Sequence, residues 1–457
     1  MALRQYYRGL SAQQVVKSTE RLASVLLVAA VLISIGSFPG YILGYPADAE
    51  RVFLVSGVFL ILLSLAMMSY AGFVLNMVTR SGVEVSVDRG FEGDILGVSY
   101  RLCNESIVPL GFVETLLRYP GHLRLAKGSR RALIVIPPKG CVVYRAWFEG
   151  RVGRHAIGPL RVVVRDPLGL FRSDEIDIGG IAELRVFPRI AIEAYRESTA
   201  LSRAIGIART RMAGSGTEFL STREYREGDE PRRIVWRHTS RWGRLIVKET
   251  ERESSLNIEI VLPIDGESFR GPYRETPFEI SARIIATLSR YIAHRGDNIA
   301  MLILSRESLE IIEPVKGVGG YRRVIRALSG VYFSPDMGAL GVESYRRTLR
   351  ILGSMISSED LVLLFIPPSP NIREAISIID TISRVVAIKR GSLLVVAPMP
   401  ETRGNGDLGV LTRVKRLSMI RNALEIVGEA RRRGVPAIAV TERGVIRIVR
   451  TIEALAR

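Results

Sequence analysis

The chain has 457 residues, of which 47% are hydrophobic, so it holds enough apolar side chains for two or three folded domains and is not a disordered protein. Its formal net charge of +18 makes nucleic acid or an anionic membrane surface a natural counter-surface. An arginine-rich surface held beside a membrane is the simpler explanation of that charge.

Two long uncharged stretches, residues 22–45 and 52–78, lie near the N-terminus. As a helix, each stretch is long enough to cross the roughly 30 Å hydrocarbon layer of a bilayer. The short loop between them predicts a membrane helical hairpin, and residues 1–80 form this first region.

Positive charge flanks the predicted hairpin on one side. The flanking basic residues are Arg4, Arg8, Lys17, Arg21, Arg80 and Arg89, whereas the loop contains only Arg51. The positive-inside rule therefore predicts a protein of the cell membrane with both termini and its soluble domains in the cytoplasm. The alternative is a cleaved signal peptide, but its apolar run would be unusually long.

Residues 81–195 contain many short β-rich runs separated by turn sequences. Residues 83–88 alternate strictly between apolar and polar side chains, and residues 137–140 and 166–169 are typical turns. This pattern predicts an all-β, immunoglobulin-like sandwich of antiparallel strands. Cys103 and Cys141 lie in this region and are expected to be small buried thiols, with one disulfide between them as the alternative.

The next region, residues 196–256, is a junction that contains a dense polar stretch. Its candidate partner-binding or junction residues are Arg223, Glu224, Tyr225, Gly228, Asp229, Arg232, Arg233, Trp236, Arg241 and Glu249. Arginine and aromatic side chains are typical of binding hot spots, although a solvated loop with locally paired charges is the plain alternative. The turn signal at Gly228 predicts that residues 223–225 and 234–236 pair as a hairpin, with Trp236 buried as an anchor.

Residues 257–457 alternate between apolar runs and amphipathic stretches. The predicted strands are residues 258–264, 299–304, 361–366, 393–397 and 437–440, and the predicted helices are residues 278–294, 321–328, 372–386 and 416–432. Such alternation predicts a doubly wound α/β sheet with helices on both faces.

The polar stretch resembles the family called domain of unknown function 58, whose pattern is R-E-Y-x-x-G-D-x-x-R-x-I-x-W followed by a Ser/Ala-Arg pair and an acidic strand. The matching residues are Arg223, Glu224, Tyr225, Gly228, Asp229, Arg232, Ile234, Trp236, Ser240, Arg241 and Glu249. Val235 departs from the aspartate that often precedes the tryptophan in the family. Residues 153–160, 166–171 and 186–189 are similar to further landmarks of the family, as is the N-terminal helix pair.

The resemblance implies a von Willebrand factor A-like α/β domain and a partnership with a MoxR-type AAA+ ATPase. Domains of this type often hold Mg²⁺ through a D-x-S-x-S sequence, a threonine and a second aspartate. Here Asp265 is followed by Glu267 and Phe269 in place of the two serines, and the other two elements are missing. We therefore expect no metal and no cofactor, with Asp265 and Glu267 as a degenerate remnant.

The leading hypothesis is a membrane-anchored, non-enzymatic scaffold or adaptor that works with such an ATPase in the assembly or maturation of other proteins. One alternative is a metal-dependent hydrolase or nuclease that uses the carboxylates of Glu218, Glu224, Asp229 and Glu230. A second alternative is a nucleic-acid-binding membrane protein. This alternative is less favoured because the arginines are spread over the whole chain. The scarcity of glutamine and the many charges are typical of a thermophile.

Overall fold

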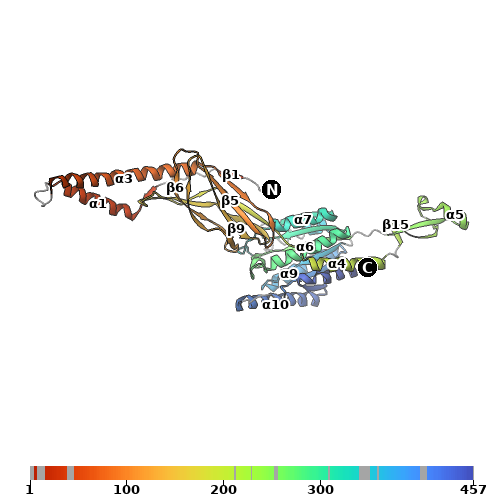
Figure 1. The fold of residues 1–457 in the computed structure, drawn as a ribbon. Coiled ribbons are helices and arrows are strands. Elements are labelled where there is room, and N and C mark those ends of the chain that lie inside the picture. Colours follow the sequence, from red (N-terminus) through yellow and green to blue (C-terminus); the bar gives the residue numbers. More distant parts are fainter. Residues whose placement is uncertain are drawn as a thin grey trace. The chain divides into compact units, whose positions relative to one another are not determined.

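The structure is a computed structural model that describes residues 5–7, 16–38, 46–209, 213–227, 229–251, 256–306, 309–338, 350–357, 360–401 and 409–455. It divides into two compact units, Met1–Val186 and Phe187–Arg457. The division falls nine residues before the predicted end of the β region at residue 195. Figure 1 gives the element labels used below.

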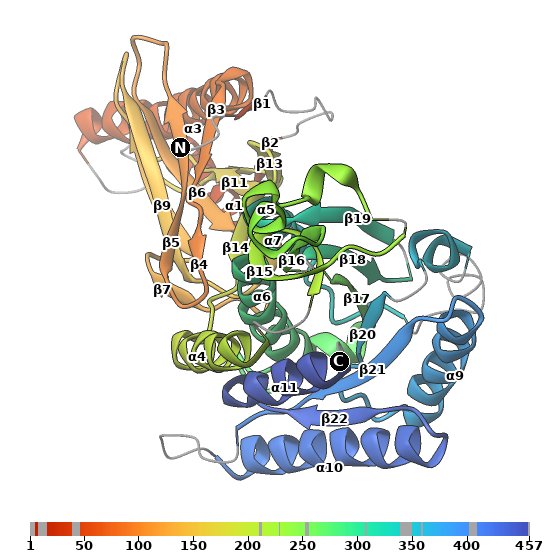
Figure 2. The same cartoon turned by 90° about the vertical axis from the view of Figure 1, so that its right-hand side faces the viewer.

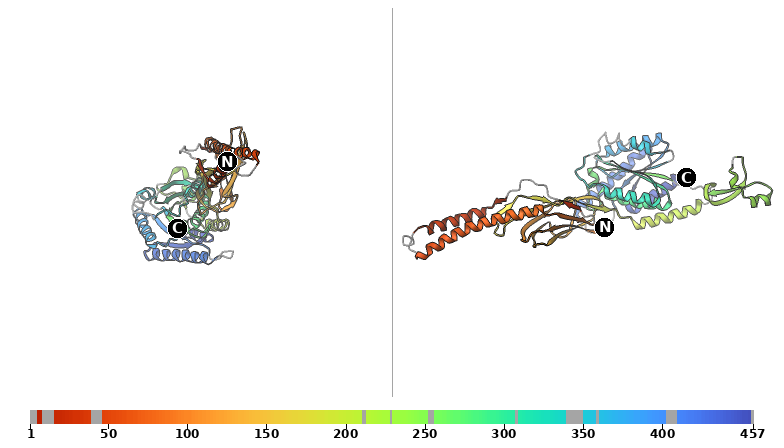
Figure 3. Two further views of the ribbon diagram at one scale, coloured as in Figure 1. Left: turned by 90° about the vertical axis from the view of Figure 1, so that its left-hand side faces the viewer. Right: turned by 90° about the horizontal axis from the view of Figure 1, so that it is seen from above.

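The first unit contains two helices near the N-terminus, α1 (Glu20–Gly36) and α3 (Ala47–Arg80), which pack along each other (Figures 1 and 3). Glycine makes this close approach feasible. A Cβ on Gly57 would lie 2.5 Å from Ile33 Cγ1 and 2.8 Å from Ala29 O, and a Cβ on Gly36 would lie 2.6 Å from Leu54 N. Small residues at such contacts are the usual way in which apolar helices pack in membranes.

Within the described residues, α3 is long and apolar enough to cross a membrane, and the candidate span is Asp48–Arg80. The predicted span 22–45 corresponds to the shorter α1, and residues 39–45 lie outside the described part of the chain. The C-terminal part of α3 differs from the prediction. Ala71, Val74 and Val78 are buried, the latter two in the core of the β strands, so only the earlier part of this helix exposes its apolar side chains.

The strands of the first unit are β1 (Gln5–Tyr7), β2 (Val16–Ser18), β3 (Val83–Val87), β4 (Gly90–Phe91), β5 (Ile95–Cys103), β6 (Leu110–Leu117), β7 (Leu125–Lys127), β8 (Arg131–Ile136), β9 (Cys141–Glu149), β10 (Gly153–Ile157), β11 (Leu160–Val164), β12 (Phe171–Ser173), β13 (Ile176–Ile178) and β14 (Ala182–Phe187). The larger sheets have the orders β1-β3-β5-β9-β7 and β13-β11-β6-β8, and the smaller ones β10-β14-β4 and β12-β2. The pairings within both larger sheets are antiparallel.

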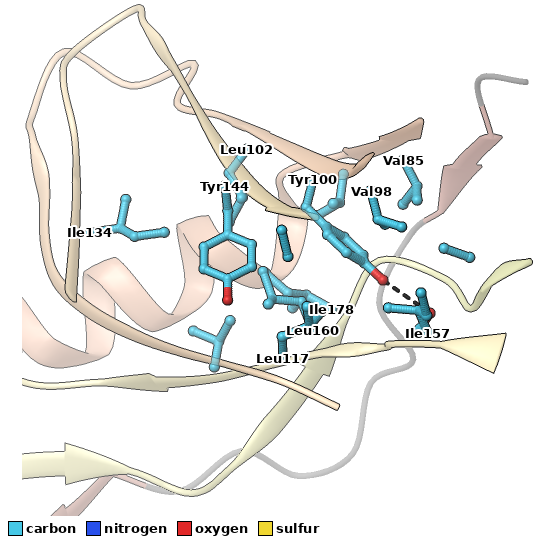
Figure 4. Close-up of a cluster of buried hydrophobic side chains, with 14 of the residues drawn as sticks. Val85, Val98, Tyr100, Leu102, Leu117, Ile134, Tyr144, Ile157, Leu160 and Ile178 are labelled. Atoms are coloured by element: carbon cyan, nitrogen blue, oxygen red, sulfur yellow. Dashed lines mark hydrogen bonds between the residues drawn. The ribbon is translucent and has the colours of Figure 1, made fainter. Parts of the chain in front are cut away.

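The two larger sheets share one apolar core. Val98, Tyr100 and Phe148 from the first sheet and Val113 and Leu160 from the second belong to the same buried cluster. Figure 4 shows part of this cluster, including the Tyr100 hydroxyl, which donates a hydrogen bond of 3.1 Å to Ile157 O. The alternation of buried and exposed residues along β5 and β9 explains why the sequence pattern identified these strands.

Cys103 and Cys141 are directly opposed at the end of the β5–β9 pair and form a disulfide. The expectation of buried thiols was therefore wrong. The two cysteines end one strand and begin the next, where the side chains leave the core, and Cys141 is exposed.

The second unit is a doubly wound α/β domain, as the sequence predicted. Its sheet has the order β19-β18-β17-β20-β21-β22 and is parallel except for β19, which runs antiparallel to β18. The strands are β17 (Asn257–Pro263), β18 (Asn298–Leu304), β19 (Leu309–Lys316), β20 (Leu361–Phe365), β21 (Ser392–Pro398) and β22 (Ala437–Val440). The antiparallel edge strand β19 is an element that the sequence analysis did not identify.

Helices cover both faces of this sheet (Figure 2). The helices of this unit include α4 (Ile192–Arg209), α6 (Pro277–Arg295), α7 (Gly317–Gly330), α9 (Ile372–Ile388), α10 (Val410–Arg432) and α11 (Val445–Leu455). Helices α9 and α10 share a core cluster with β17, β20 and β21. Helix α4 packs on α6 and α11, and the Thr287 hydroxyl of α6 accepts a 2.9 Å hydrogen bond from Ala191 N just before α4 begins. These contacts explain why the second unit begins earlier than the sequence suggested.

Candidate functional site

The polar stretch folds into a pair of strands with a small helical insertion between them. Strand β15 (Ala213–Glu224) pairs antiparallel with β16 (Ile246–Glu251), and η1 (Pro231–Arg233) and helix α5 (Trp236–Trp242) lie between them. Arg223 stands opposite Val247, so the predicted pairing of residues 223–225 with residues 234–236 was wrong. The partner of β15 comes later in the chain, and Ile234 and Val235 bridge to the other side of that partner, β16.

Helix α5 is held against β16 at its base. Val235 N donates to Ile246 O at 2.8 Å, and Ile246 N donates to the Thr239 hydroxyl oxygen at 3.1 Å. Gly243 ends the helix in the left-handed conformation with φ of 66°, where a glycine has no steric cost. Thr239 therefore marks the inner face of α5.

Three arginine–carboxylate pairs tie this segment together. Both guanidinium Nη atoms of Arg223 donate to Asp229 at 2.7 Å. The hydrogen bond from Arg223, followed by that from the Arg226 amide, lowers the pKa of Asp229 to about 2. The other two pairs join Arg244 to Glu224, and Arg233 to Glu230 at 3.3 Å. These carboxylates are already bound to arginines of the same segment.

A second set of arginines has no such partner. Arg232, Arg237 and Arg241 are exposed and have no ion-pair partner among the described residues. Arg237 and Arg241 are four residues apart, so they share the face of α5 opposite Thr239. Like charges at this spacing destabilise an isolated helix. An anion bound between them would remove this repulsion.

Two exposed tryptophans flank these arginines. The exposed fractions of Trp236 and Trp242 are 65% and 67%. The prediction that Trp236 is a buried anchor was wrong, because α5 is too short and too polar to enclose it. We call Arg232, Arg237, Arg241, Trp236 and Trp242 the Arg–Trp surface, and Figure 1 labels the helix α5 that carries four of them.

The other candidates of the polar stretch are distributed differently. Tyr225 is half-buried, and its amide donates to Leu245 O at 2.8 Å. Gly228 lies outside the described residues. Glu249 lies on β16, opposite Ser221 of β15. Its side chain, like that of Glu218, is outside the described part of the structure. The described structure thus brings Arg223 and Asp229 together and pairs Glu224, Asp229 and Glu230 of the proposed carboxylate cluster with separate arginines.

Asp265 and Glu267 lie at the carboxyl ends of the central strands of the second unit, where open α/β sheets commonly bind ligands. Asp265 Oδ1 accepts hydrogen bonds from Ser268 N at 2.9 Å and from the Ser268 hydroxyl at 2.7 Å, and Glu267 pairs with Arg270 at 2.6 Å. The described residues contain no group of three or more acidic, histidine or cysteine side chains suited to a metal ion. The absence of a bound cation stays a prediction.

The sequence analysis missed two buried titratable positions. His122 Nε2 lies 3.0 Å from His155 Nδ1, and His155 Nε2 lies 2.8 Å from Arg151 O. Burial, followed by the neighbouring His155, lowers the pKa of His122 to about 3. The second position is Glu259 in β17, which is 3% exposed and whose pKa is raised to about 7 by burial and then by Asp360. Thirty-three residues separate the two histidines, and no local motif indicated either position.

Comparison with known families adds a finding that bears on the Arg–Trp surface. Residues 221–391 match the family described as "Protein of unknown function DUF58". This match confirms the resemblance to domain of unknown function 58. The DUF58 match includes most of the polar stretch and the first four strands of the α/β sheet. The upstream landmarks at residues 153–171 and 186–189 lie outside it.

No curated protein matches the chain significantly. Among solved structures, an aerotolerance-related membrane protein from Bacteroides fragilis is 13% identical, with a TM-score of 0.25 over 43% of this chain and 98% of that one. The SpRpn10 VWA domain is 10% identical, with a TM-score of 0.25 over 43% of this chain and 95% of that one. The doubly wound sheet agrees with the von Willebrand factor A-like domain that the resemblance to the DUF58 family implies.

Proposed function

We propose that this protein is a membrane-anchored, non-enzymatic scaffold or adaptor that works with a MoxR-type AAA+ ATPase in the assembly or maturation of other proteins. The Arg–Trp surface is the observation that carries the proposal. Arginine and tryptophan are enriched among the hot-spot residues of protein interfaces, and here both kinds are exposed, with the arginines lacking an ion-pair partner within the described residues. An acidic segment of the ATPase or of a client protein would complement them.

The pairing of the carboxylates supports a binding role over a hydrolytic one. Glu224, Asp229 and Glu230 each bind an arginine of the same segment, which is the arrangement expected of structural ion pairs. A metal-dependent nuclease or hydrolase needs carboxylates that converge on one point. A protein partner is favoured over a nucleic acid because the arginines are spread over the whole chain and are not gathered in one basic patch.

The anchoring part of the proposal takes α1 and α3 as a two-helix membrane hairpin, with both termini and the soluble units in the cytoplasm, and takes the β unit as an immunoglobulin-like sandwich. The close glycine-mediated packing of α1 on α3 supports the hairpin. Protease treatment of sealed right-side-out vesicles tests the orientation, because soluble units in the cytoplasm stay protected. Digestion of either unit from outside would reject the cytoplasmic placement.

A pull-down from native membranes, read by mass spectrometry, tests the adaptor role. Reversing the charges in Arg237→Glu with Arg241→Glu should weaken capture of the partner at least tenfold, since each charged hydrogen bond contributes about 1.5–3 kcal/mol. The matched control exchanges the members of one ion pair on the same segment, Glu224→Arg with Arg244→Glu, and keeps the net charge. Equal capture by the wild type and the Arg237/Arg241 variant would contradict the proposal. Recovery of nucleic acid with a steep salt dependence would favour the alternative.

A further inference from the structure

A cleft in the first unit lies beside the beginning of α1. It has a volume of about 510 Å³, and its lining includes Arg21, Arg131, Leu133, Arg165 and Leu168. Arg21 comes from the first turn of α1, Arg131 and Leu133 from β8, and Arg165 and Leu168 from the turn after β11. The cleft therefore joins the start of an apolar helix to the edge of a β-sheet.

The start of α1 is fixed to that turn by hydrogen bonds. Thr19 N donates to Leu170 O at 2.8 Å, and the Thr19 hydroxyl donates to Gly169 O at 2.7 Å. Arg21 lies over the same turn, with its Nη1 atom 3.1 Å from the position that a Cβ on Gly169 would take. The guanidinium of Arg21 is thus positioned by the fold of the unit.

The level of the cleft relative to a bilayer follows from the exposed apolar side chains of the helices. On α1 these begin at Leu26, which is 42% exposed, and on α3 they extend from Val52 to Met68. Arg21 precedes Leu26 by five residues, or about 7.5 Å along the helix axis. The polar interface of a bilayer is about 5–8 Å thick on each side of the hydrocarbon. If the exposed apolar side chains lie in hydrocarbon, Arg21 lies at the level of the lipid headgroups.

The charges around the cleft favour an anion. Arg21 and Arg131 have no ion-pair partner among the described residues, and Arg165 pairs with Glu114 at 2.8 Å. The other lining carboxylate, Asp166, is buried and accepts hydrogen bonds from Leu168 N at 2.9 Å and Phe171 N at 2.5 Å. Its oxygens are therefore used within its own turn, and it forms no ion pair with Arg21 or Arg131 among the described residues.

Apolar side chains also line the cleft. Leu133 and Leu168 are 61% and 46% exposed, although both are large aliphatic residues. A phospholipid site combines arginines, which bind the phosphate, with aliphatic side chains, which contact the acyl chains. A soluble phosphate compound would give no reason for the exposed leucines.

We propose that this cleft binds the phosphate headgroup of an anionic phospholipid of the leaflet that faces the soluble units, with Arg21 and Arg131 as its main ligands. The inference rests on the membrane anchoring in the proposed function. A bound lipid would fix the β unit against the bilayer surface.

The test uses the full-length protein in mild detergent and native mass spectrometry with added phosphatidylglycerol or phosphatidylcholine. The wild type should retain phosphatidylglycerol in preference to phosphatidylcholine. Arg21→Gln with Arg131→Gln should weaken this retention about tenfold or more. The control variant, Arg145→Gln, removes an exposed arginine of β9 in the other large sheet and should bind like the wild type. Hydrogen exchange of the β strands verifies that each variant is folded.

Three results would overturn the inference. The first two are equal retention of both lipids by the wild type and unchanged retention of phosphatidylglycerol by the folded Arg21/Arg131 variant. The third is competition by glycerol phosphate at the same concentration as the lipid, because it would identify a site for soluble phosphates. Carbonate extraction of native membranes tests the anchoring separately. Release of the protein by carbonate would reject the membrane anchor itself, whereas a retained protein without lipid preference rejects only the lipid site.

Discussion

Glu259 offers a sharp test of the reasoning about the α/β unit. It lies on the central strand β17, where its neighbours in the sheet are Ala300 and Val362. Neither carboxylate oxygen has a hydrogen-bond partner among the described residues. The adjacent Asp360 is already used, since it accepts hydrogen bonds from Asn257 at 2.9 Å and Ser357 N at 2.6 Å. The folded state therefore favours the neutral form of Glu259.

The sign and size of the effect follow from the pKa. Burial raises the pKa of Glu259 from its ordinary 4.5 to about 7 in the folded protein, so between these values the folded state binds the proton that the unfolded state releases. Stability must then fall as the pH rises from about 4.5 to about 7. The full difference corresponds to about 3 kcal/mol. At pH 4 both states are protonated, and the effect vanishes.

Glu259→Gln keeps the shape of the protonated side chain and cannot ionise. We expect the variant to match the wild type at pH 4 and to exceed it by up to about 3 kcal/mol at pH 8. The assay is the denaturant dependence of hydrogen exchange in the peptide that contains β17, measured on the full-length protein in mild detergent. Glu425→Gln, at an exposed position of α10, is the matched control. Parallel pH dependences of the wild type and the Glu259 variant would refute the assignment.

Two further expectations concern the other unusual side chains. Trp236→Ala should change the free energy of unfolding by less than about 1 kcal/mol, compared with 3–5 kcal/mol for a buried tryptophan, because the ring is 65% exposed. It should nevertheless reduce partner capture in the pull-down, and a large loss of thermal stability would contradict the exposed placement. Replacing both Cys103 and Cys141 by serine should destabilise the β unit by about 2–4 kcal/mol, because the disulfide closes a loop with a sequence separation of 38. Hydrogen exchange should then accelerate in β5 and β9 but not in β17, and unchanged exchange in β5 would count against a stabilising bond.

The fold was largely predictable because burial imposes periodic patterns on the sequence. Each of the five predicted parallel strands has its counterpart within two residues at either end, since a strand covered on both faces is a continuous apolar run. The antiparallel edge strand β19 was not predicted because its mixture of apolar and charged residues, Leu309–Lys316, resembles a loop. Edge strands need apolar residues on one face only, so their pattern is weaker.

The candidate site was predictable in its location but not in its arrangement. Composition singled out residues 223–249, yet the pairing of Arg223 with Asp229 and the exposure of Trp236 depend on where α5 is placed. Tryptophan is usually buried, so propensity gave the opposite expectation. The sequence also gave no sign of the buried Glu259, because one carboxylate within an apolar run does not alter the pattern that identifies the strand.

The Cys103–Cys141 bond and the flanking arginines bear on the same question of compartment. Disulfides persist mainly in oxidising compartments, whereas the positive-inside rule assigns the β unit to the cytoplasm. The two agree for proteins of hyperthermophiles, whose intracellular proteins are rich in disulfides. The scarcity of glutamine, with three residues in the chain, fits that case. A protected β unit with an intact disulfide would therefore favour such an organism. In a mesophile one of the two assignments must fail, and the orientation assay identifies which one.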